Sequence, residues 1–332
     1  MNTPSINVNE VKGFFVRNNC YFILLLLVII SAILSPVFLT KQNIFNVLRQ
    51  QVPIAFMALG ALMVILTGGI DLSTGANLAV CNIVLAYLLT NVGMNSYSGL
   101  ALAIPTAIAV GAVVGGFNGL LVSYLNMPAF IVSLGTMTMV RGIGYMITGG
   151  SPIRLPVNPE TTPGSAGLYR FGQTGDPLIG MPWAVWAVII VVAFFYLMMK
   201  YTSFGRLIVA TGSNQTAARL AGVNVRLYKL AVFIISGALA GLAGVMVAAR
   251  GGIATPTVAT GFELDSIAAV VIGGATLAGG RGRVINSIVG VFILALIGNI
   301  MNLLSVPAYP RQVIQGAIII IAVLMSSRSK EA

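Results

Sequence analysis

The stretch Lys200–Lys229, KYTSFGRLIVATGSNQTAARLAGVNVRLYK, is the longest polar interval between apolar segments that contains basic residues and no acidic ones. Because basic loops of membrane proteins stay in the cytoplasm, we assign it to the cytoplasmic side. Its centre predicts a short helix, with Asn214 as N-cap, helix-forming residues over Gln215–Ala221 and Gly222 in the left-handed position that follows. Two helical turns are not stable alone in water, so the membrane domain or a partner must hold this helix. We interpret it as a docking helix that takes force from a cytoplasmic motor; a basic loop that only fixes topology is the alternative.

The composition places the chain in a membrane. Hydrophobic residues make up 58% and charged residues 8%, against roughly 45–50% and 25% in soluble domains. The net charge of +11 is spread over segment ends rather than gathered in one patch, so it indicates orientation in the bilayer and not a nucleic-acid partner. Histidine is absent and there are two cysteines, which argues against a His/Cys metal site, a histidine base and a disulfide framework.

Apolar runs predict an all-α membrane protein of about ten transmembrane helices, forming one permease domain over residues 1–332. The first run, Cys20–Leu39, follows Lys12 and Arg17 and is long enough to span. The other candidate spans are about 52–69, 75–92, 100–124, 129–148, 181–199, 230–249, 262–278, 284–303 and 312–326.

Ten spans would put both termini in the cytoplasm. Basic residues at 200–229, at Arg281 and Arg283 and in the tail with Arg328 and Lys330 agree with this orientation. Lys41, Arg49 and Arg311 fall on the outer side and oppose it.

The segment 149–180 is rich in proline and glycine and carries charges of both signs without periodicity, so we expect an external loop. Its length suits capping a cavity or receiving an outside partner, and a passive connector is the alternative.

Two faint repeats lie about 180 residues apart. Thr67–Ile70 (TGGI) is echoed by Arg250–Ile253 (RGGI), and Met127–Phe130 (MPAF) by Val306–Tyr309 (VPAY). Five spans separate the members of each pair, so the two copies would face opposite sides of the membrane. Such inverted five-helix repeats are typical of transporters, and chance similarity of glycine-rich or proline-containing turns is the alternative.

Acidic residues in or near the membrane are the first candidate site residues. Asp71 stands between two apolar runs, where it would form a proton or cation site. In the alternative, Asp71 or Ser73 would cap the helix that starts near Gly75. The cap is favoured because no second acidic residue occurs in the first five spans. Glu263 and Asp265 begin the span 262–278, where they would complement the positive end of the helix dipole or contact a substrate.

Amide side chains within the spans form a second group of candidates: Asn77, Asn82, Asn118, Asn299 and Asn302, with Gln312 and Gln315 near the last span. Neutral amides match a polyhydroxylated solute better than an ion, and hydrogen bonding between helices is the alternative role for each. The candidates for the translocation path or its gate are Asp71, Ser73, Asn77, Asn82, Asn118, Glu263, Asp265 and Asn299.

Small residues repeat on two predicted helices, as Gly111-x-x-x-Gly115-x-x-x-Gly119 and Gly237-x-x-x-Gly241, and predict close helix crossings. No lysine follows a glycine, so the chain lacks a phosphate-binding loop of the Gly-Lys-Ser/Thr type. If ATP drives the process, another chain must bind it.

These motifs resemble those of permease subunits of bacterial ABC importers for sugars, of the ribose/galactose/autoinducer type and most of all the ribose type. The resemblance runs from about the first span to the last. It rests on Thr67–Gly75 (TGGIDLSTG), Gly149–Ile153 (GGSPI), Phe204–Arg206 (FGR) followed by Asn214, Ala217, Ala218 and Gly222, then Glu263–Gly274 (ELDSIAAVVIGG) and Ala278–Arg283 (AGGRGR).

The resemblance implies a permease in the bacterial inner membrane, paired with a second copy in a homo- or heterodimer and embedded in lipid. It implies no catalytic residues, an ABC ATPase subunit that binds ATP and Mg in place of this chain, and an extracytoplasmic sugar-binding protein. It assigns ATPase coupling to Gly205, Arg206, Asn214, Ala217, Ala218 and Gly222, with the two small alanines letting the helix sit deep in a cleft of the ATPase.

The sequence departs from the family pattern at Thr74, Ser213 and Val223, and Asn77, Cys81 and Asn82 make the third span polar, which leaves the solute open. A pentose such as ribose is the first choice, ahead of a hexose, a polyol or an autoinducer-type sugar. A secondary transporter that uses Asp71 with an ion gradient is the alternative from another class. A membrane enzyme is disfavoured because the chain shows no nucleophile–base arrangement.

Overall fold

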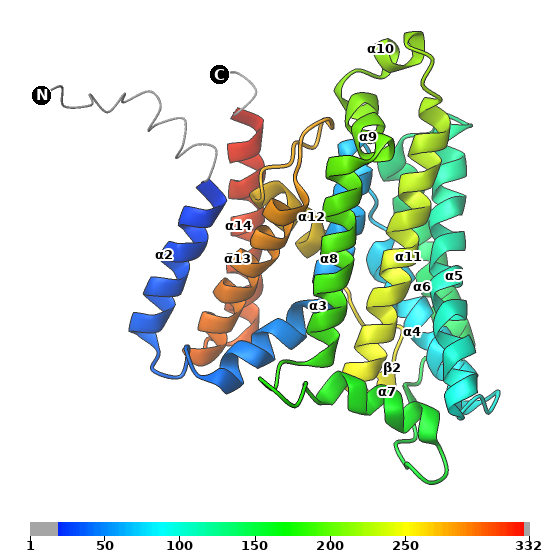
Figure 1. The fold of residues 1–332 in the computed structure, drawn as a ribbon, viewed down its shortest axis with the longest axis vertical. Coiled ribbons are helices and arrows are strands. Elements are labelled where there is room, and N and C mark those ends of the chain that lie inside the picture. Colours follow the sequence, from blue (N-terminus) through cyan, green and yellow to red (C-terminus); the bar gives the residue numbers. More distant parts are fainter. Residues whose placement is uncertain (1–18, 329–332) are drawn as a thin grey trace, which may run out of the picture.

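The computed structural model describes residues 19–328 as a bundle of helices with one small strand pair (Figure 1). In chain order the elements are α2 (Asn19–Leu34), α3 (Lys41–Leu66), α4 (Thr74–Thr90), α5 (Tyr97–Ser123), α6 (Ala129–Thr148), β1 (Ile153–Arg154), α7 (Pro163–Gln173), α8 (Trp183–Tyr201), α9 (Ser203–Ser213), α10 (Gln215–Leu220), α11 (Val225–Gly251), β2 (Ile253–Ala254), α12 (Phe262–Ile272), α13 (Val284–Leu303) and α14 (Ala308–Arg328). The predictions that rest on Lys12, Arg17 and Lys330 lie outside the described residues.

Six helices in the described chain are long and apolar enough to cross a membrane: α3, α5, α6, α8, α11 and α13. Helices α2 and α4 are apolar but shorter. The spans predicted at 129–148 and 284–303 coincide with α6 and α13. The multi-pass helical class is confirmed, and the count of ten spans stays a prediction.

Two sequence-based expectations are corrected in part. The predicted span 262–278 is α-helical only as far as Ile272, because Gly274 has φ = +92°, a left-handed conformation that ends the helix, and the N–H of Ala275 donates to the carbonyl of Val270. The segment 149–180, expected as an external loop, holds regular structure, and its external position stays a prediction. It contains α7 and β1, and β1 pairs antiparallel with β2, so a contact more than 90 residues away in sequence orders it.

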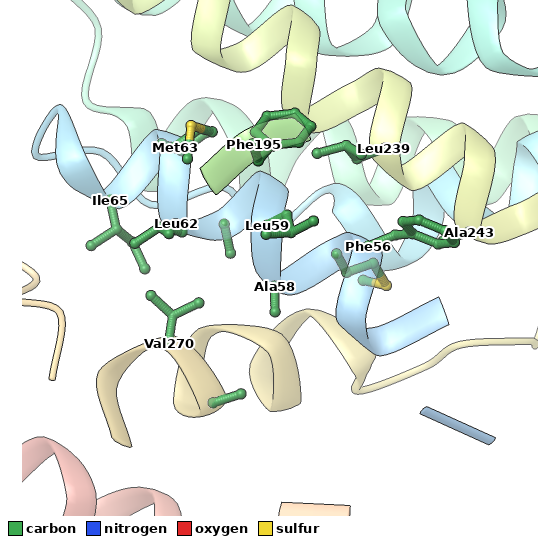
Figure 2. Packing of buried hydrophobic residues seen from close by; sticks show 14 of the residues in the cluster. Phe56, Ala58, Leu59, Leu62, Met63, Ile65, Phe195, Leu239, Ala243 and Val270 are labelled. Carbon is green, nitrogen blue, oxygen red and sulfur yellow. The ribbon is translucent and has the colours of Figure 1, made fainter. Parts of the chain in front are cut away.

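Helix α3 is the centre of the hydrophobic core. Phe56, Leu59 and Leu62 are fully buried, and α3 begins at Lys41, 11 residues before the predicted start at 52. Figure 2 shows α3 between α12, which presents Val270, and α8 and α11, which present Phe195 and Leu239. An apolar helix surrounded on all sides matches a buried position in the bundle.

The predicted glycine motifs on α5 and α11 meet at one crossing. A Cβ atom on Gly111 would lie 2.4 Å from the carbonyl oxygen of Gly237, and one on Gly115 would lie 2.1 Å from that of Phe233. Any side chain here would separate the helices, so the predicted close crossing is confirmed.

The ends of the bundle differ. Helices α9 and α10 lie at the same end as the beginning of α2 and the end of α14, whereas α7 and β2 lie at the opposite end (Figure 1). Helix α12, with 11 residues, rises only about 16 Å, roughly half the thickness of a bilayer core.

The two faint repeats occupy equivalent places. A left-handed glycine follows α3 at Gly68 and α11 at Gly252. Pro128 precedes α6 as Pro307 precedes α14, and each glycine turn is followed by a shorter helix, α4 or α12. The inverted relation of the two halves stays a prediction that these correspondences support.

Candidate functional site

A buried polar centre lies where the chain passes from α3 to α4. The backbone N–H and the hydroxyl of Ser73 donate to Oδ1 of Asp71, at 3.0 and 2.6 Å, and the hydroxyl of Ser236 on α11 donates to Oδ2 at 3.3 Å. The amide of Asn118 on α5 donates to the Ser73 hydroxyl at 2.8 Å. Asp71 is 4% exposed and Asn118 is fully buried, so this network joins three segments inside the protein.

The favoured cap interpretation is wrong in its detail. Ser73 occupies the N-cap position of α4, but its side chain accepts no hydrogen bond from the helix and donates to Asp71 instead. Asp71 therefore organises the turn before the helix rather than the first turn itself.

Asn77 and Asn82 connect helices. Asn77 donates to the carbonyl of Gly111 on α5 at 3.1 Å, and Asn82 donates to that of Gly244 on α11 at 3.2 Å. Both are at most 1% exposed. These contacts fit the alternative in which the amides hold helices together.

Glu263 lies between the beginnings of two helices. Its Oε1 accepts from the backbone N–H of Gly261 at the start of α12, and its Oε2 lies 2.0 Å from where a Cβ on Gly75, in the first turn of α4, would be. No donor in residues 19–328 is hydrogen-bonded to Oε2. The carboxylate thus faces two positive helix ends, as the dipole interpretation predicted for α12.

Arg141 on α6 fixes the chain that leads into α12. Its Nη1 donates to the carbonyl of Val258 at 2.9 Å and also to that of Pro256. The entrance of α12 is therefore tied to α6 as well as to α4.

A separate polar cavity lies between α3, α12, α13 and α14. Two predicted path residues, Asp265 and Asn299, line it. Gln315 donates to Oδ1 of Asp265, while Asn299 exchanges two hydrogen bonds with Asn43 on α3, at 2.8 and 3.1 Å. Further polar lining residues are Gln50, Gln51, Asn302 and Arg311.

The predicted path residues thus fall into two groups. Asp265 and Asn299 face the cavity, whereas the other six, Asp71, Ser73, Asn77, Asn82, Asn118 and Glu263, are buried elsewhere and do not line it. Because the amides of Asn299 and Gln315 are already paired with Asn43 and Asp265, the cavity groups best placed for a solute include Gln50, Gln51 and Asn302.

The predicted short helix is present as α10, and its docking role stays a prediction. Oδ1 of Asn214 accepts from the backbone N–H of Ala217 at 2.9 Å, and Gly222 has φ = +82°, as both residue types predicted. Lys229 on α11 donates to Oε1 of Gln215 at 3.1 Å and ties α10 to the membrane domain. A six-residue helix is held here by its cap and by this contact.

The side chains that α10 exposes differ from those expected. Ala217 is exposed, but Ala218 is 7% exposed and buried against its own chain, so of the two alanines only Ala217 is available to a partner. Leu220 is 85% exposed at the tip. The sequence analysis selected the alanines and missed this leucine, whose only signal was its place as the last residue of a short polar helix.

Gly205 and Arg206 shape the preceding helix, α9. The N–H of Gly205 donates to the hydroxyl of Thr202, and a Cβ here would lie 2.5 Å from the backbone of Met199. Nη2 of Arg206 donates to the hydroxyl of Ser203 at 3.0 Å. Both residues turn the chain from α8 into α9.

At the opposite end, Asp176 orders a tight turn. Its carboxylate accepts from the backbone N–H groups of Ile179, Leu178 and Met181 and, at 3.3 Å, from the indole of Trp186. These donors, Ile179 foremost, hold the pKa of Asp176 below its ordinary value. The turn presents Leu178, which is 92% exposed.

Comparison with known proteins identifies the family. Residues 43–323 match the family described as branched-chain amino acid transport system / permease component. The chain belongs to this family. The permease has no significant match among solved structures.

Named relatives of the permease align over almost its whole length. Ribose import permease protein RbsC of Escherichia coli (strain K12) is 39% identical over 319 residues, covering 96% of both chains. RbsC of Bacillus subtilis (strain 168) is 38% identical over 310 residues, covering 93% of the permease and 92% of that protein. Galactose/methyl galactoside import permease protein MglC of Escherichia coli (strain K12) is 34% identical over 336 residues, covering 97% of both.

The predicted resemblance to ribose-type permeases is therefore confirmed. The permease is a multi-pass membrane protein and a transport subunit rather than an enzyme.

Proposed function

We propose that this chain is the transmembrane subunit of an ATP-driven importer for a small sugar, with a ribose-like pentose as the favoured solute. The observation that carries the proposal is the 39% identity to a ribose import permease over 96% of both chains. A hexose remains the nearest alternative, because a galactose/methyl galactoside permease aligns over 97% of the chain at 34% identity.

The polar cavity between α3, α12, α13 and α14 forms part of the path. It offers neutral donors and acceptors from Gln50, Gln51, Asn302 and Gln315, together with the Asp265 carboxylate. Such groups suit hydroxyls, which donate and accept hydrogen bonds, better than an ion. A second permease copy completes the path.

The end of the bundle that carries α10 faces the cytoplasm. The basic residues of the 200–229 segment favour this orientation, which places the start of α2 and the end of α14 on the same side. The permease then lies in the inner membrane of a bacterium, with ten membrane-crossing segments of which α4 and α12 are shortened.

Helix α10 receives the motion of a separate ATPase, which binds ATP and Mg. The exposed Leu220 and Ala217 offer an apolar contact on a helix already held by Asn214. At the outer end, the ordered turn at Asp176 and helix α7 form the docking region for a sugar-binding protein.

The test is reconstitution in liposomes. The permease, its ATPase and the binding protein, with ATP inside the liposomes and the binding protein outside, are expected to accumulate ribose, and uptake should persist when ionophores remove proton and sodium gradients. The permease alone should accumulate none. Uptake that needs an ion gradient and ignores ATP would establish the Asp71-dependent secondary transporter instead.

A further inference from the structure

We propose that Gly212 is a positioning residue that transmits the movement of α10 to the interior of the membrane domain, through a junction of three backbone segments. The inference rests on the proposed ATPase coupling and names the contact through which it acts. The glycine junction consists of Gly212–Ser213 at the end of α9, Leu66–Gly68 at the end of α3 and Gly279–Gly280 in the turn between α12 and α13.

Gly212 touches two of these segments at once. A Cβ atom on Gly212 would lie 1.8 Å from the carbonyl oxygen of Leu66 and 2.7 Å from the backbone nitrogen of Gly280. No side chain fits there, so the end of α9 rests directly on backbone.

The other two segments are bonded to each other. The N–H of Gly280 donates to the carbonyl of Leu66 at 2.9 Å. A Cβ on Gly279 would lie 2.8 Å from the nitrogen of Gly68, and one on Gly280 would lie 2.7 Å from Cα of Ser213. Gly279 and Gly280 both have positive φ, so the close contact and the backbone shape require glycine together.

The position of the junction allows a movement of α10 to reach α3 and the turn after α12. Gly212 lies two residues before Asn214, the cap of α10, so a displacement of α10 reaches the junction through a very short length of chain. On its other side, Leu66 leads through a short turn to Asp71 and the start of α4, and Gly279 follows α12. Backbone in contact with backbone has no rotamers to absorb a movement, so α3 and the turn after α12 must shift with α9.

The glycines of the Ala278–Arg283 motif gain a role in this way. None of them lines the cavity described above. Gly279 and Gly280 let the turn after α12 approach α9.

The test compares two variants in the reconstituted complex with ATPase and binding protein. Gly212→Ala forces the junction apart, and an insertion of two glycines between Ser213 and Asn214 separates α10 from an intact junction. Gly142→Ala is the matched control, because a Cβ on Gly142 meets no atom within 4 Å.

Gly212→Ala and the insertion variant are each expected to assemble with the ATPase and to hydrolyse ATP within about twofold of wild type, while sugar transported per ATP falls at least tenfold. A merely structural defect lowers assembly and hydrolysis together and leaves that ratio unchanged. If Gly212→Ala does not assemble, the insertion variant decides.

A wild-type ratio in the insertion variant, or in an assembled Gly212→Ala complex, overturns the inference. Failure of the proposed function itself is a different result, in which the wild-type complex shows no ATP-dependent uptake.

Discussion

The cap of α10 gives the sharpest prediction for the coupling segment. In Asn214→Ala the N–H of Ala217 loses its 2.9 Å hydrogen bond to the side chain. Loss of an N-cap costs about 1 kcal/mol, which corresponds to a roughly fivefold change in an equilibrium. Since α10 has six residues and few other restraints, we expect this cost to appear as local fraying rather than global unfolding.

Hydrogen exchange of the reconstituted permease measures the fraying. The amides of Ala218, Ala221 and Val223 donate within or just after α10 and should exchange about fivefold faster in Asn214→Ala. Sugar uptake by the reconstituted complex should fall in the same variant. Asn214→Ser keeps a capping oxygen and should restore both properties.

Asn224→Ala is the matched control. Asn224 caps α11 in the same manner, accepting from the N–H of Leu227 at 3.3 Å, but α11 has 27 residues and is packed along the bundle. Its loss should leave α10 exchange and uptake unchanged. Equal exchange in Asn214→Ala and Asn214→Ser, or normal uptake with a frayed α10, refutes the reasoning.

Three further predictions concern the polar contacts. Asp71→Leu leaves the two donors of Ser73 and the hydroxyl of Ser236 without their acceptor, and it should lower the free energy of unfolding in detergent by at least about 2 kcal/mol. Asp71→Asn should lower it by less than about 1 kcal/mol. Equal losses in the two variants would contradict the hydrogen-bond assignment. Gly75→Ala should cost about 1–3 kcal/mol, because its Cβ would lie 2.0 Å from Glu263 Oε2, and the loss should shrink in the Glu263→Ala background, where strict additivity would disprove the contact. Because the pKa of Asp176 is depressed, its contribution to the order of the turn is present above the unfolded pKa of about 3.9 and is lost as pH falls through the folded pKa. Trp emission should therefore stay constant from about pH 7 to 5 and shift to the red only in stronger acid, while the emission of Asp176→Ala should be shifted at every pH. Identical emission from both proteins would exclude the carboxylate as the group that orders the turn.

Several features were predictable because they depend on neighbouring residues. The cap at Asn214 and the left-handed Gly222 follow from residue chemistry within a few positions, and both are present. The apolar runs at 129–148 and 284–303 also gave correct helix limits. The glycine repeats on α5 and α11 predicted a crossing, although the sequence did not say which helices would meet.

Other features depended on distant segments. The loop expected at 149–180 contains α7 and pairs through β1 with β2, about 100 residues further along the chain, while the span expected at 262–278 was too long because the left-handed Gly274 ends α12. The eight candidate path residues are similar in kind, yet only Asp265 and Asn299 line the cavity, because helix rotation and packing choose which polar side chain faces a space.

By itself the sequence determined that this protein is a helical membrane permease of the sugar-importer kind, with a short capped helix in its basic segment. The length of apolar runs, the distribution of basic residues and the helix caps are properties of contiguous residues, and for this reason they could be predicted from the sequence. Only the tertiary structure decided that Ala218 faces its own chain, that Leu220 is free, and that Gly212, Leu66 and Gly280 touch. The contact of Gly212 with Leu66 and Gly280 joins segments more than 60 residues apart in sequence, and the sequence does not show which segments will meet.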